Sequence, residues 1–119
     1  LESIQNATDQ AKTVAKNIHG MKEKYNFVPW FWSDQLNIKL QIVGLLDLNS
    51  NIETKIIGSQ ESSKFSNFIF ADNQLQAVES INSPGHHLIM KNNWGKRHLL
   101  KKDHLTSDFN LKNFFNSLA

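Results

Sequence analysis

The stretch KFSNFIFADNQLQAVESI, Lys64 to Ile81, decides the fold that this sequence can form. It contains two runs rich in apolar and aromatic residues, Lys64–Phe70 and Gln74–Ile81, and the short polar link Ala71–Asn73 separates them. Such runs favour strands, and a link this short joins two strands that run in opposite directions. The stretch therefore predicts a β-hairpin.

Three further runs with strand character precede this hairpin, namely Trp30–Trp32, Lys39–Leu46 and Ile52–Gly58. Polar, turn-forming segments lie between them, such as LNSN at 48–51 and SQESS at 59–63. Five short strands with links of hairpin length predict one antiparallel sheet.

A helix is predicted before the first strand. Ser3 is a typical N-cap, Gly20 is a typical residue after a helix end, and apolar residues recur between them at helical spacing. This apolar stripe consists of Ile4, Ala7, Ala11, Val14, Ala15 and Ile18. Because the stripe is rich in alanine, this helix can approach a neighbouring element closely.

Two more helices are predicted after the sheet. Pro84 suits the first turn of a helix that covers roughly 86–96. A second helix is indicated by the i, i+3, i+4, i+7 spacing of Leu111, Phe114, Phe115 and Leu118. The fold class is therefore α+β: one helix, then a five-stranded antiparallel sheet, then helices that cover one face of the sheet.

The composition excludes several classes of protein. A length of 119 residues suits one domain. The net charge of +2 is small and the basic residues are scattered, which argues against a nucleic-acid-binding surface. Without cysteine it forms no disulfide and no Cys-ligated metal site. No apolar run approaches the ~20 residues of a membrane span, so we expect a cytoplasmic protein. The start at Leu1, inside a helix-start pattern, is typical of a piece of a longer protein.

The sequence contains no catalytic or metal-binding motif. His86 and His87 would point about 100° apart on a helix, and no carboxylate completes a metal-ligand spacing. The acidic residues are dispersed, and the isolated glycines form no nucleotide-binding loop. We therefore expect no catalytic residue and no metal ligand, and histidines that are solvent-facing or partly buried.

The run VPWFWSDQ, Val28–Gln35, is the remaining candidate for a functional site. On a strand, Trp30 and Trp32 point to one face and Phe31 to the other, which places two indoles ~7 Å apart. Two interpretations are open. The pair either fills the core under a helix, or forms a flat surface for a planar ring system or a protein partner.

Three stretches together resemble the C-terminal part of the FAD-dependent NAD(P)H:ferredoxin reductases that serve oxygenases. The most specific is YNFVPWFWSDQLNIKLQIVGL, Tyr25–Leu45. LESIQNATDQAKTVAKNIHG, Leu1–Gly20, resembles the last helix of the family's FAD-binding domain, and the segment from Phe65 to Leu88 resembles its hairpin and helix start. Ser83 departs from the family pattern, because it stands where the family has arginine.

The resemblance implies two parts: residues 1–20 as the terminal helix of an FAD-binding domain, and residues 21–119 as the C-terminal reductase domain. It implies a full-length enzyme that passes electrons from NAD(P)H through FAD to a small acidic 2Fe–2S ferredoxin or a rubredoxin. Upstream domains would bind FAD and NAD(P)H, and the isolated chain would bind neither and be inactive. Structural classifications often call this domain a dimerisation domain. In the isolated chain the indoles that would face the flavin lose their cover, so we expect an exposed aromatic face and self-association of two copies through it.

The resemblance also assigns roles to individual residues. The backbone at Ile4 matches the position where a helix N-terminus meets the flavin, and Glu2 and Gln5 would flank it. Trp30 and Trp32 match the paired indoles beside the flavin ring.

Lys12 falls where the family often has a basic residue, and it is a candidate contact for an acidic ferredoxin, the alternative being a solvated helix face. The alternative for the whole chain is a free-standing α+β interaction or dimerisation module without a flavin.

Overall fold

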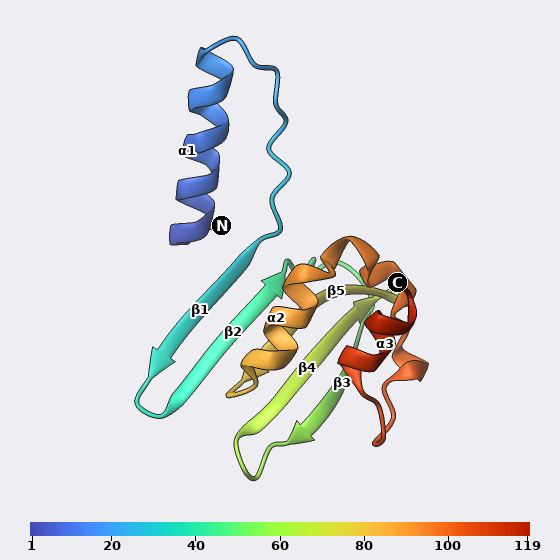
Figure 1. The fold of residues 1–119 in the computed structure, drawn as a ribbon. Coiled ribbons are helices and arrows are strands. Elements are labelled where there is room, and N and C mark those ends of the chain that lie inside the picture. The colour runs from blue at the N-terminus through green and yellow to red at the C-terminus, as the bar shows by residue number, and fades with distance from the viewer.

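Five strands form one antiparallel sheet, as the sequence predicts, and the structure gives their order as β1-β2-β5-β4-β3 (Figure 1). The structure, a computed structural model, describes residues 1–119. The strands are β1 (Trp30–Gln35), β2 (Ile38–Gly44), β3 (Ile52–Ser59), β4 (Lys64–Ala71) and β5 (Gln74–Ile81). The predicted hairpin is the β4–β5 pair, and its two turn residues have φ of 50° at Asp72 and 59° at Asn73. Positive φ at both positions matches the right-handed twist of the paired strands.

Strand β2 ends at Gly44, two residues before the predicted end at Leu46. Gly44 has φ of 94°, and a side-chain carbon there would lie 2.6 Å from the ring of Trp94. Only glycine adopts this conformation without strain and permits this close contact. The glycine therefore stops the strand and lets Trp94 pack directly on its backbone.

The helices are α1 (Ile4–Ile18), α2 (Pro84–Asn92) and α3 (Leu111–Ser117), with 3-10 helices η1 (Trp94–Leu99) and η2 (Lys102–His104). The predicted helix over 86–96 is in fact α2 followed by η1. At Asn93 the side-chain Nδ2 donates to the Ile89 carbonyl at 2.8 Å, and the backbone N–H is shared between Ile89 and Met90. This local bonding competes with continuation of the α-helix, which tightens into a 3-10 turn.

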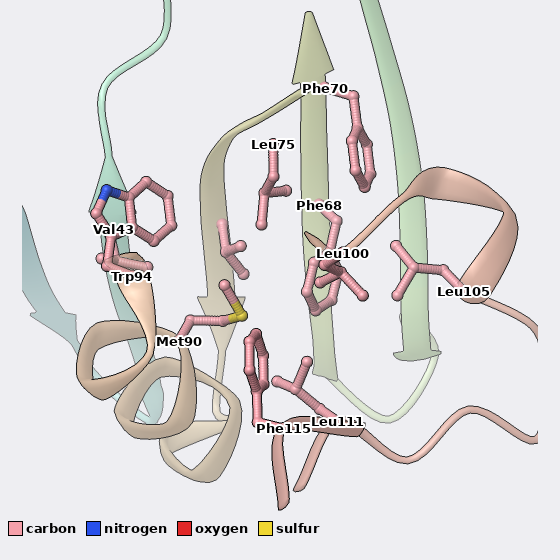
Figure 2. Packing of buried hydrophobic residues seen from close by; sticks show 11 residues of the cluster. Val43, Phe68, Phe70, Leu75, Met90, Trp94, Leu100, Leu105, Leu111 and Phe115 are labelled. Carbon is pink, nitrogen blue, oxygen red and sulfur yellow. The ribbon is translucent and has the colours of Figure 1, made fainter. Parts of the chain in front are cut away.

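One core fills the space between the sheet and the helices that follow it. Figure 2 shows apolar side chains from β2, β4 and β5 pointing toward those of α2, η1 and α3. The cluster consists of Val43, Phe68, Phe70, Leu75, Val78, Met90, Trp94, Leu100, Leu105, Leu111 and Phe115. Helix α2 lies against β2 and β5, and Trp30 of the edge strand β1 packs against this core.

Helix α1 stands away from this core, and its apolar stripe is largely exposed in this chain (Figure 1). Ile4 is 70% exposed and Ile18 is 79% exposed, whereas Gln5 and Thr13 are the buried residues of the helix. The connecting segment 19–29 accounts for this, because it runs back along the polar side of α1. There the Tyr25 hydroxyl donates to Asn6 at 2.7 Å.

Candidate functional site

The N-terminal end of α1 lies beside the start of β1 (Figure 1). A hollow of about 300 Å³ separates them. Its lining consists of Ile4, Gln5, Thr8, Asp9, Trp30 and Trp32. Four of the residues singled out from the sequence thus lie around one space. Glu2 borders an adjoining cavity that Trp30 also lines.

The two indoles form a stack on the helix-covered face of the sheet. Their ring centroids are 5.3 Å apart and their planes are inclined by 27°. The prediction that both rings share one face is confirmed, and they lie closer than the ~7 Å repeat of a strand because the rings lean together. Trp30 packs against the core, whereas Trp32 is 38% exposed. The pair is therefore part core and part surface.

Helix α2 contributes two further residues to the aromatic pair. The Nζ atom of Lys91 lies 3.8 Å from the centroid of the Trp30 ring, and the ring of His87 lies 6.1 Å from it. A cation over an indole face is attracted by the ring's negative face. Lys91 therefore fixes the ring and gives the pair a positive neighbour.

His87 is deeply buried, contrary to the expectation of a solvent-facing or partly buried ring. It is 4% exposed, and its Nδ1 has no hydrogen-bond partner. Burial lowers the pKa of His87, and the positive charge of Lys91 lowers it further. The neutral form next to Trp30 is thus favoured.

His86 points away from its neighbour, as adjacent residues on a helix must. Its Nδ1 lies 2.9 Å from Ser66 Oγ, which lies 2.9 Å from Ser80 Oγ inside the core. Burial lowers the pKa of His86 as well. The two histidines therefore face different surroundings.

The first turn of α1 presents free backbone amides near the hollow. Ser3 caps the helix by accepting from the Asn6 N–H at 3.1 Å, and the Ala7 N–H donates to the Ser3 carbonyl. The amides of Ile4 and Gln5 have no intrahelical partner. The helix dipole adds partial positive charge at this end, so these amides favour an electron-rich group beside them.

The Gln5 side chain joins this turn to the sheet. Its Oε1 accepts from the Trp30 backbone N–H at 3.2 Å, and its Nε2 donates to Asp9 Oδ2 at 2.6 Å. The carboxamide flanks the hollow with its polar atoms already engaged.

Lys12 lies further along α1, outside the lining of the hollow. Its side chain is largely exposed and pairs loosely with Asp9 at 3.9 Å. An exposed pair of this kind contributes little stability, so the ammonium group stays available to an external partner.

A second, apolar cavity of about 400 Å³ lies on the sheet face that no helix covers. Phe31, Ile42 and Ile69 line it together with Leu1 and Leu46. Phe31 thus faces opposite to the indoles, as strand alternation requires. No helix in the chain is both long and apolar enough to cross a bilayer.

Two residues of the aromatic site were missed in the sequence, His87 and Lys91. They are four residues apart, so they share one face of a helix. That spacing was visible, but only the fold shows that this face turns toward Trp30.

A family model described as "Reductase C-terminal" matches residues 30–115. Among curated relatives, rhodocoxin reductase from Rhodococcus erythropolis is 44% identical over 89 residues, which cover 74% of this chain and 20% of the relative. Putidaredoxin reductase from Pseudomonas putida is 36% identical over 84 residues, which cover 71% of this chain and 19% of the relative. The chain thus corresponds to about a fifth of these relatives.

Solved structures of such reductases are also similar to this chain over nearly its whole length. A ferredoxin reductase for the CYP199A2 system from Rhodopseudomonas palustris superposes with a TM-score of 0.85 and 36% identity, over 96% of this chain and 28% of that one. The reductase in a covalent putidaredoxin reductase–putidaredoxin complex gives a TM-score of 0.85 at 29% identity, over 98% and 28% of the two chains.

Proposed function

This chain belongs to the reductase C-terminal family, and from that premise we propose that it is the C-terminal domain of a flavoprotein ferredoxin reductase. The complete protein would pass electrons from NAD(P)H through FAD to a small iron–sulfur protein. Residues 1–20 would complete an FAD-binding domain, and residues 21–119 would wall the flavin and help form the docking surface. The observation that carries this proposal is the hollow between α1 and the stacked indoles.

The residues around the hollow fit an isoalloxazine ring. Trp30 and Trp32 offer a flat aromatic wall of the kind against which planar rings stack. The free amides of Ile4 and Gln5, at the positive end of α1, suit the electron-rich pyrimidine edge of a flavin. Glu2 borders the same region. When bound, FAD would accept a hydride from NAD(P)H and release electrons singly.

The chain's own residues would orient the ring and exclude water. Trp30 is held in place by the core and by Lys91, so the wall is preorganised. Trp32 is the more exposed indole and would cover the flavin on its outer side. Removing water from that side strengthens the electrostatic effect of the helix end on the ring.

The docking surface would use positive charge on α1 and α2. Lys12 is free of any strong ion pair, and Lys91 lies over Trp30. An acidic 2Fe–2S ferredoxin or rubredoxin would be steered toward such a surface, with a rate that falls as salt rises.

The test compares the 119-residue chain with a longer protein that includes the preceding part of the gene. The longer protein should purify yellow with one FAD, and the 119-residue chain should purify colourless. Trp32→Ala in the longer protein should raise flavin fluorescence, because a stacked indole quenches it, while Trp32→Phe should give an intermediate value. A longer protein that purifies without flavin would refute the proposal, and a yellow 119-residue chain would refute the statement that it is inactive alone.

A further inference from the structure

We infer that Gln5 is a positioning residue, which sets the width of the hollow by tying the first turn of α1 to Trp30. The inference rests on the proposed function, since the hollow it adjusts is the proposed flavin site. In this role the Gln5 carboxamide connects α1 to β1 within the protein and is not itself a ligand of the flavin. The flavin-facing group at this position is then the backbone.

The carboxamide of Gln5 bridges two elements. Gln5 is 6% exposed, its Oε1 accepts from the Trp30 N–H at 3.2 Å, and its Nε2 donates to Asp9 at 2.6 Å. Asp9 belongs to the next turn of the same helix, so this second bond fixes the side-chain conformation. The hydrogen bond to Asp9 therefore orients the Oε1 atom of Gln5 toward the Trp30 N–H.

This bridge is the only hydrogen bond that joins α1 to the sheet. Strand β1 is at the sheet edge and pairs with β2 on one side alone, so the Trp30 amide would otherwise have no partner in the protein. The remaining polar bonds of α1 go to its own turns or to the connecting segment, as at Glu23 and Tyr25. Gln5 is thus the one side chain that joins α1 to Trp30 by a hydrogen bond.

Both the backbone and the ring of Trp30 are held by neighbouring residues. Gln5 holds the backbone of this residue, and Lys91 and Trp32 hold its ring. A shift of the backbone would move the ring relative to Lys91 and open the stack. A displacement of about 1 Å at a reacting geometry can lower a rate by about 100-fold, so loss of this bond should affect turnover.

Three variants of the longer, flavin-containing protein test the inference. Gln5→Met keeps the length and burial of the side chain and removes both hydrogen bonds. The double variant Gln5→Glu with Asp9→Asn rebuilds the bridge with the polarity of its second bond reversed, because a carboxylate accepts from both Trp30 and Asn. Gln10→Met is the control, since Gln10 is exposed and bonds only to Asn6 on its own helix.

The first readout is hydrogen–deuterium exchange at the Trp30 amide, which requires no flavin. Loss of one hydrogen bond should speed exchange about three- to tenfold in Gln5→Met, with wild-type rates in the double variant and in Gln10→Met. The second readout is steady-state reduction of an acidic 2Fe–2S ferredoxin. Here kcat should fall at least threefold in Gln5→Met with KM for the ferredoxin unchanged, and the double variant should recover it.

Two results would overturn the inference. One is exchange at Trp30 that is the same in Gln5→Met and wild type, or equally raised in Gln10→Met. The other is faster exchange without any fall in kcat. A protein that carries no flavin but shows the expected exchange pattern would refute the proposed function and support the positioning role of Gln5. Failure of the proposed function can therefore be told apart from failure of this inference.

Discussion

The ammonium group of Lys91 lies 3.8 Å above the ring of Trp30, so a residue of α2 secures the first residue of β1. The contact joins the last helical turn of α2 to the edge strand of the sheet. It also places a positive charge next to an indole that stacks on a second indole. Helix α2 therefore helps to set both the position and the electrostatic surroundings of the aromatic pair.

Lys91→Met should weaken the packing of Trp30, since it keeps the aliphatic stem and removes the cation. We expect a loss of about 0.5–2 kcal/mol in the free energy of unfolding, measured by chemical denaturation. Lys91→Arg is the matched control, because it keeps a cation over the ring. Equal stability of both variants and wild type would contradict a stabilising contact.

Stability should fall on acidification because the pKa values of His86 and His87 are lowered in the folded state. The unfolded chain then binds more protons than the folded one, so stability falls as pH drops from the unfolded histidine value of about 6.5 toward the lower folded values. Thermal melts between pH 7.5 and 5 measure this. His87→Phe should flatten the dependence, and an unchanged slope would contradict the role of this ring.

Gly44→Ala should be strongly destabilising, by more than about 2 kcal/mol, because it combines a positive φ with a clash against Trp94. Gly85→Ala is the control, since a side chain there meets nothing within 4 Å and the residue is helical. That change should be neutral or stabilise by about 0.5–1 kcal/mol. Similar melting temperatures for the two variants would contradict the packing described at Gly44.

The exposed stripe of α1 should tolerate charge. Val14→Lys and Ile18→Lys should change the unfolding free energy of the 119-residue chain by less than about 0.5 kcal/mol, since both residues are exposed. They should also reduce self-association in light scattering. Thr13→Lys is the contrast, because Thr13 is buried and bonds to Asp9, and it should destabilise clearly.

The strands were predictable because alternation and turn residues act locally. The bounds of β5 match the predicted run, and β4 extends it by one residue. The end of β2 was missed, because the positive φ of Gly44 follows from its contact with Trp94, which is distant in sequence. The exposure of the α1 stripe could not be predicted either, because periodicity identifies an apolar face of a helix but does not say what covers it.

The aromatic site was predictable in part. That Trp30 and Trp32 share a face follows from strand geometry alone and is confirmed. Spacing alone could not decide between core and surface, because Trp30 packs against the core whereas Trp32 is exposed. The contact with Lys91 depends on where α2 crosses the sheet, which no local pattern encodes.

The single bond between Gln5 and Trp30 has a consequence for how the chain melts. An isolated 15-residue helix is only marginally stable in water, and α1 contributes no residue to the hydrophobic core. On heating, α1 should therefore lose its structure before the sheet does, in two separate steps. A group seated between helix and indoles would merge these steps into one cooperative transition, so calorimetry alone would reveal whether the space is filled.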